Sequence, residues 1–163
     1  MAEVCQEWEA ESYKASAEKI RVVNLRIGIV LGRDGGALGK MLTPFKLGVG
    51  GPIGKGNQWM SWIHIDDVIG LVMFSVRNAG LLGGVNATAP EPVTNRDFSS
   101  KLGHALHRPA ILPAPVFALR LVFGEFAEML ATGQRILPEK ALSLGYSFQF
   151  PKLETALSDI VKN

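Results

Sequence analysis

The sequence predicts an α/β fold in its first hundred residues, followed by a mostly helical end. Three observations support this fold class. Residues 2–19 have helical composition, residues 20–31 form a dense run of β-branched residues, and residues 58–76 combine a strand pattern with an apolar helix. A helix leading into such a strand is half of a βαβ unit, so a parallel sheet is expected.

The first helix carries one apolar stripe, since Val4, Cys5, Trp8, Ser12 and Ala15 recur at helical spacing. The run that follows, "IRVVNLRIGIVL", is nearly continuous in apolar residues. This pattern is typical of a strand that is covered on both faces.

A glycine-rich segment separates this strand from the next strand. It includes a short predicted helix over residues 37–47 and a loop over residues 48–56. A strand is expected over residues 58–65. Asp66 is then the expected N-cap of a largely buried helix that contains Val68 to Val76, because its carboxylate would accept amide hydrogens of the first turn.

The remaining elements have recognisable starts and ends. "GVNATA" is a short strand pattern, and Thr94 with Asp97 three residues later predicts a capped helix. Further helices are expected over residues 116–130, from Pro138 to the break at Gly145, and from Pro151 to the end. In the last helix the residues expected to face inward are Leu153, Leu157, Ile160 and Val161.

Composition excludes several classes of function. Hydrophobic residues make up 47% of the 163 residues, the net charge is +2, and no run of Lys or Arg suggests nucleic-acid binding. The only cysteine, Cys5, forms no internal disulfide, and no apolar stretch has the length of a membrane span. The expected location is the cytoplasm, or an organelle stroma or matrix if a targeting segment has been removed.

Few residues have the spacing of a known catalytic site. The three histidines lack carboxylate or thiolate partners at ligand spacing, so no metal site is expected. Two readings of "WIHIDDV" stay open. In one, His64 bonds to the backbone and Asp66 caps a helix; in the other, Trp59 or Trp62 forms a wall for a planar ligand beside the glycine loop.

Longer stretches carry a family resemblance. They are "WEAE", "LRIGIVLGRDGGALGKMLTPFKLGVGGPIGKGNQWMSWIHIDD" and "VNATAPEPVTNRDF", with a C-terminal stretch beginning "LPAPVFALRLVFGEF". They resemble the epimerase-like subfamily of extended short-chain dehydrogenases/reductases, which includes the bacterial YfcH-type proteins. The resemblance implies the C-terminal half of a Rossmann-like NAD(P)-binding fold over residues 1–108, with a small helical domain over residues 109–163.

The implied function is that of an NAD(P)-dependent, nucleotide-sugar epimerase-like oxidoreductase acting on a small molecule, with NADP or NAD as cofactor. The chain departs from that family in two ways. It contains no glycine fingerprint for the cofactor pyrophosphate. It also has no Tyr-x-x-x-Lys pair, because the residue four positions after Tyr13 is Ala17 and the residue four positions after Tyr146 is Phe150. By the resemblance, Glu3 and Glu7 stand where the pair would be. We therefore expect the chain alone to be inactive, and a non-catalytic interaction or structural protein on the same scaffold is the alternative.

The resemblance also assigns residues to the two sides of a site. Arg26, Gly28 and Val30 match the segment that passes the nicotinamide. The substrate-side residues are Lys40, Met41, Phe45, Trp59 and Trp62. Gly28 is equally well explained as a bend at the end of a strand, and Lys40 as a solvated charge on a helix.

An association is expected as well. A sheet without its first strands leaves the strand Arg21–Leu31 with an open apolar edge, next to the helix face that carries Trp8. The chain is expected to self-associate through these surfaces or to pair with the missing N-terminal half.

Overall fold

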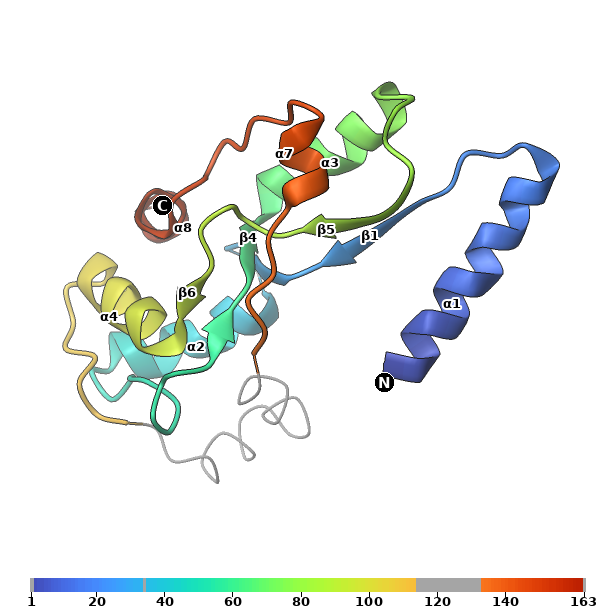
Figure 1. Cartoon of the computed structure of the whole chain (residues 1–163). Helices are drawn as coiled ribbons and strands as arrows, with labels where there is room; N and C mark the ends of the chain where they lie inside the picture. The colour runs from blue at the N-terminus through green and yellow to red at the C-terminus, as the bar shows by residue number, and fades with distance from the viewer. Residues whose placement is uncertain (1, 34, 114–132, 163) are drawn as a thin grey trace.

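A computed structural model describes residues 2–33, 35–113 and 133–162 and has an α/β architecture (Figure 1). The elements in chain order are α1 (Ala2–Lys14), a 3-10 turn (Ala15–Glu18), β1 (Val23–Ile27), β2 (Ile29–Leu31), α2 (Gly36–Lys46), β3 (Trp59–Met60), β4 (Trp62–His64), α3 (Ile65–Arg77), β5 (Gly83–Ala87), β6 (Val93–Thr94), α4 (Asn95–Ala105), α7 (Glu139–Ser143) and α8 (Leu153–Val161). The predicted helix over residues 116–130 lies outside the described residues.

The strands form three pairs. β1 is parallel to β5, β2 is parallel to β4, and β3 is antiparallel to β6. In the first pair Val23 lies opposite Gly83 and Ile27 opposite Ala87. Helix α3 connects β4 to β5 as a crossover, which a parallel arrangement requires.

The prediction of one continuous strand over residues 20–31 is wrong, because the chain changes partner at Gly28. The amide of Gly28 donates to the carbonyl of Ala87 at 3.0 Å, whereas the next amide, of Ile29, donates to the carbonyl of Ser61 at 2.9 Å. A Cβ at Gly28 would overlap that Ser61 carbonyl oxygen, so only glycine lets the two backbones approach this closely. The strand is also not covered on both faces, since Ile27 is 52% exposed.

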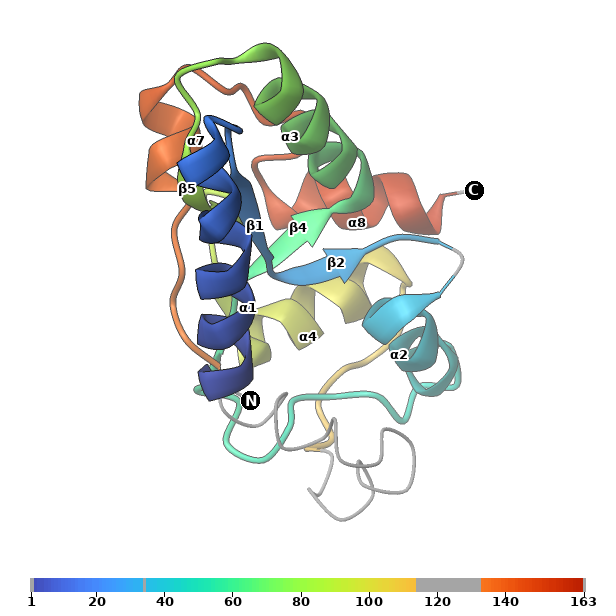
Figure 2. The ribbon, with the colours of Figure 1, turned by 90° about the vertical axis from the view of Figure 1, so that its right-hand side faces the viewer.

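Two clusters of buried side chains hold the molecule together. The larger one joins α2, α4 and α8 around Trp62 and Phe98, which are both fully buried. The smaller one joins β5, α3 and α7 through Val85, Leu71 and Ala141. Figure 2 shows α8 next to α4, with α1 in front of β1 in this view.

Helix α3 differs from its prediction in its start and in its burial. The N-cap is His64, whose Nδ1 accepts the amide hydrogen of Asp66 at 3.2 Å, so Asp66 belongs to the first helical turn instead of capping it. The expectation of a largely buried helix is also wrong. Leu71 faces the core, but Ile69 and Val76 lie on an exposed apolar face, because no described part of the chain covers that side.

The described helices of the C-terminal part agree with their predictions, except that Val161, expected to face inward, is only half-buried. Pro138 precedes α7, and Gly145, with φ of 86°, follows it in the left-handed region. In α8, Leu153, Leu157 and Ile160 are buried. For α4, the Thr94 hydroxyl accepts the amide hydrogen of Asp97 at 3.2 Å and donates to the Asp97 carboxylate at 2.7 Å.

Candidate functional site

A groove of about 500 Å³ lies between α1 and the β1–β5 pair. Helix α1 contributes Cys5, Trp8 and Glu9 to its wall, and β1 contributes the residues from Val23 to Ile27. The other side is formed by Gly28, Thr88 and Ile136.

The groove reaches the carboxyl ends of two parallel strands. Gly28 directly follows β1, and Thr88 directly follows β5. Ligands of open α/β sheets bind outside the carboxyl ends of the strands, where loops leave a crevice. The position of this groove is therefore that of a ligand site in such a fold.

An ion pair crosses the groove from α1 to β1. The Arg26 guanidinium donates two hydrogen bonds of 2.7 Å to the two carboxylate oxygens of Glu9. These hydrogen bonds hold the pKa of Glu9 below its ordinary value. One turn further along α1, the side-chain amide of Asn24 donates to the Ser12 hydroxyl at 2.8 Å. An anionic ligand that used Arg26 would have to compete with Glu9.

The structure brings together two of the three residues expected near the cofactor. Arg26 and Gly28 both line the groove. Val30 lies in β2 and packs against the smaller core cluster. A glycine at position 28 also has a structural reason, because the Ser61 carbonyl approaches it closely. The structure therefore contains the bend that was one of the two explanations for Gly28, and this bend requires no ligand contact.

The five residues expected on the substrate side do not share one surface. Met41, Phe45 and Trp62 are buried in the larger core cluster, and the Trp62 indole donates to the carbonyl of Glu91 at 3.0 Å. Lys40 lies on the exposed face of α2. Trp59 is 36% exposed, and the Arg135 guanidinium lies 5.4 Å from the centre of its ring. None of the five lines the groove beside β1, and their role as substrate contacts stays a prediction.

His64 is buried, and its Nδ1 is hydrogen-bonded, whereas its Nε2 has no hydrogen-bond partner among the described residues. Its ring is 2% exposed and lies 3.9 Å, centre to centre, from the ring of Phe150. Nδ1 caps α3, and Nε2 lies 3.5 Å from a carboxylate oxygen of Asp159 on α8. This histidine joins the start of α3 to α8 in the interior.

Sequence reasoning missed the residue that organises this region, Asp67. Its buried carboxylate accepts the amide hydrogens of Gln149 at 2.8 Å and Phe150 at 2.9 Å, and the Tyr146 hydroxyl at 3.3 Å. Burial, with the neighbouring Asp67 charge, raises the pKa of Tyr146. The only local signal for Asp67 was its place beside Asp66 at the start of an apolar helix.

The described ranges contain neither a metal-binding cluster nor a membrane-spanning helix. No group of three His, Cys, Asp or Glu side chains there could hold a metal ion. Among the helices in the same ranges, none combines the length and apolarity needed to cross a membrane.

Comparison with known families decides where the chain belongs. Residues 1–85 match the model of the NAD dependent epimerase/dehydratase family, and residues 114–160 match a domain of unknown function, DUF1731. The chain belongs to the NAD dependent epimerase/dehydratase family. The groove beside β1 is built from the part that matches this family model, completed by Thr88 and Ile136.

The curated relatives of this chain are longer proteins, and the chain matches about half of each of them. The chain is 44% identical over 162 residues to the chloroplastic epimerase family protein SDR39U1 homolog of Arabidopsis thaliana, covering 99% of this chain and 46% of that protein. It is 46% identical to mouse epimerase family protein SDR39U1, covering 94% and 53%. The chain thus spans about half the length of the curated relatives that it matches.

Solved structures agree with the fold. The crystal structure of human epimerase family protein SDR39U1 (isoform 2) with NADPH superposes with a TM-score of 0.83 at 44% identity, covering 88% of this chain and 49% of the human chain. The nucleoside-diphosphate sugar epimerase of Corynebacterium glutamicum gives a TM-score of 0.78 at 30% identity, covering 99% and 31%. The fold of this family member is therefore the Rossmann-like α/β fold of these proteins.

Proposed function

We propose that the chain supplies the nicotinamide and substrate side of an NADP-dependent, nucleotide-sugar epimerase-like oxidoreductase. The observation that carries the proposal is the groove at the carboxyl ends of β1 and β5, where Gly28 and Thr88 meet. The choice of NADP rests on the human relative, whose crystal structure is named as one with NADPH.

The residues present fit one part of such a cofactor only. A nicotinamide ring is planar and largely apolar, and the indole of Trp8 and the backbone at Gly28 offer a wall of that kind. The 163 residues contain no glycine fingerprint for the pyrophosphate, so the groove lacks the contacts that bind the phosphates.

A nicotinamide cofactor supplies hydride transfer when it is bound. This chain's contribution is to orient the ring, and the chain offers no Tyr-x-x-x-Lys pair for the accompanying proton transfer. Tyr146 does not replace that pair, because its hydroxyl is hydrogen-bonded to Asp67 on α3, away from the groove residues. We therefore propose that the isolated chain is inactive.

Binding experiments with the two halves of the cofactor test the proposal. Calorimetry with NADPH on the 163-residue chain should show no micromolar affinity. Nuclear magnetic resonance at millimolar concentration should show that nicotinamide mononucleotide shifts the amides of Gly28 and Thr88, whereas 2′-phospho-ADP leaves them unchanged.

A pair of variants on α1 provides the control. Trp8→Ala removes a groove wall and should abolish the shifts caused by nicotinamide mononucleotide. Val4→Ala changes an exposed apolar residue of the same helix that does not line the groove, so it should preserve them. A micromolar dissociation constant for NADPH, or shifts that spread over α4 and α8 instead of the groove, would overturn the proposal.

A further inference from the structure

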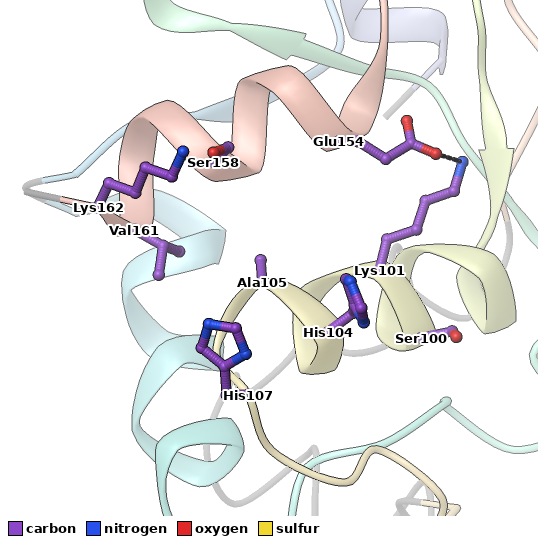
Figure 3. A pocket seen from close by; sticks show the side chains of 9 residues that line it. All are labelled: Ser100, Lys101, His104, Ala105, His107, Glu154, Ser158, Val161 and Lys162. Carbon is purple, nitrogen blue, oxygen red and sulfur yellow. Dashed lines mark ion pairs between the residues drawn. The ribbon is translucent and has the colours of Figure 1, made fainter.

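A second pocket, of about 550 Å³, lies between α4 and α8 (Figure 3). It shares no residue with the groove beside β1. Its polar lining includes Lys101 and His104 on α4, His107 just beyond α4, Glu154 and Ser158 on α8, and Lys162 at the end of α8. Glu154 and Ser158 lie within the match to the domain of unknown function, whereas Lys162 lies just beyond it.

The charged side chains around this pocket are two lysines, Lys101 and Lys162, and one carboxylate. The single carboxylate of its lining, on Glu154, is paired with the Lys101 ammonium at 2.9 Å, and this hydrogen bond lowers the pKa of Glu154. No hydrogen bond or ion pair joins the side chains of His104, His107 and Lys162 to the described parts of the chain. Figure 3 shows the His104 imidazole in front of the α4 ribbon and the His107 imidazole beside the end of α4, with the Lys162 ammonium on the α8 side.

The backbone at His107 adds a second, geometric observation. His107 has φ of 54°, in the left-handed region, where the amide hydrogens of His107 and Arg108 bond to carbonyls of the last turn of α4. Glycine or asparagine usually occupies this position after a helix. A histidine at this position brings a ring into the pocket lining, where a glycine would leave none.

We propose that this pocket binds the phosphate group of a small molecule. Ammonium and imidazole groups donate charge-assisted hydrogen bonds to phosphate oxygens, and the hydroxyls of Ser100 and Ser158 add neutral donors. The volume falls within the range of small-molecule sites and exceeds what a bare phosphate needs, so an organic phosphate ester fits.

A simpler explanation of the same positive charges competes with the proposal. His107 and Lys162 lie at the carboxyl ends of α4 and α8, where cations stabilise the helix dipole without any ligand. The two explanations differ in their consequences. Charges that only complement helix ends affect the melting temperature and leave anion affinity unchanged.

Calorimetry with inorganic pyrophosphate as the probe separates them. The full 163-residue chain at pH 7 and fixed ionic strength should bind pyrophosphate saturably and melt at a higher temperature than in sodium chloride. His104→Gln combined with Lys162→Gln should weaken the affinity about tenfold or more. Both side chains are exposed, so the double variant should still fold.

Matched variants complete the test. Lys55→Gln removes an exposed lysine outside the pocket and should leave pyrophosphate affinity unchanged, and Lys162→Arg should retain most of it. Should the double variant fold poorly, the single change Lys162→Glu provides the same test and should abolish saturable binding. An unchanged dissociation constant in these pocket variants, or a wild-type response no larger than that to sodium chloride, would overturn the proposal.

Discussion

Helix α1 and the C-terminal helix α8 both carry an apolar stripe, but the stripe of α8 is buried and that of α1 is exposed. In α8, Leu153, Leu157 and Ile160 are buried against α4 and β2. In α1, none of residues 3–14 is buried, and Trp8, the largest residue of its apolar stripe, is 72% exposed. Figure 1 shows α1 standing apart on the right of the molecule, while α8 lies near α4 on the left.

The polar contacts of the two regions also differ in burial, because those of α1 are partly exposed and those near α8 use the buried side chain of Asp67. Helix α1 is tied to β1 by Glu9 with Arg26 and by Ser12 with Asn24, at partly exposed positions. The segment that leads into α8 is tied to α3 by the buried carboxylate of Asp67. An apolar stripe thus indicates that a helix has a face to cover, but it does not indicate which surface covers it.

The largest effect is expected where the C-terminal segment is attached. Asp67→Ala leaves the amides of Gln149 and Phe150 without their acceptor, while the Tyr146 hydroxyl keeps its hydrogen bond to the backbone carbonyl of residue 67. The free energy of unfolding should fall by about 3 kcal/mol or more, because each buried donor that loses its partner costs about 1–3 kcal/mol. Urea denaturation followed by circular dichroism measures this loss.

The neighbouring carboxylate provides the matched control. Asp66 is about half exposed and only complements the first turn of α3, so Asp66→Ala should cost less than about 1 kcal/mol. Equal losses for the two alanine variants would contradict the assignment of Asp67 as the attachment point.

A smaller effect is expected from blocking the exposed edge near α1. We propose that the free edge of β1, which pairs only with β5 among the described strands, and the Trp8 face of α1 are covered by a second copy of the chain or by the N-terminal half of the protein. Sedimentation of the isolated chain at micromolar concentration should show self-association. Ile27→Lys should weaken it about tenfold, since a charge on an edge strand opposes pairing.

The exposed apolar face of α3 offers a control for this association. Ile69→Lys changes a residue of similar exposure away from β1 and should leave the association constant unchanged. A folded monomer with protected amides along β1 would contradict the proposed association.

The smallest effect concerns the pH dependence of α1 docking. The pKa of Glu9 in the folded protein lies below the ordinary value of 4.5, because Arg26 hydrogen-bonds the charged carboxylate. The pair therefore stabilises the docked helix fully above pH 4.5 and is lost as the pH falls through the lowered pKa. Amide exchange in α1, corrected for intrinsic rates, should accelerate between pH 6 and pH 3.

Glu9→Gln tests the cause of that acceleration. The variant should show faster exchange in α1 already at pH 6, and it should lose the part of the pH response that depends on the ion pair. Identical protection of α1 in the wild type and in Glu9→Gln at pH 6 would rule out the pair as the docking contact.

Local sequence alone determined the elements whose physical causes lie within a few residues. The Thr94–Asp97 cap, the helix between Pro138 and Gly145 and the apolar stripe of α8 depend on contacts three or four residues apart, and the structure contains all three. The family membership followed from longer motifs of the same sequence.

Only the tertiary structure decided the features that depend on distant partners. The break between β1 and β2 at Gly28 depends on the close approach of the Ser61 carbonyl. The role of Asp67 depends on its hydrogen bonds to amides about 80 residues further along the chain. Whether the apolar faces of α1 and α3 are buried or exposed likewise depends on which distant segments pack against them. A residue pattern carries no record of such partners, because burial and hydrogen bonding between distant segments are settled only when the chain packs.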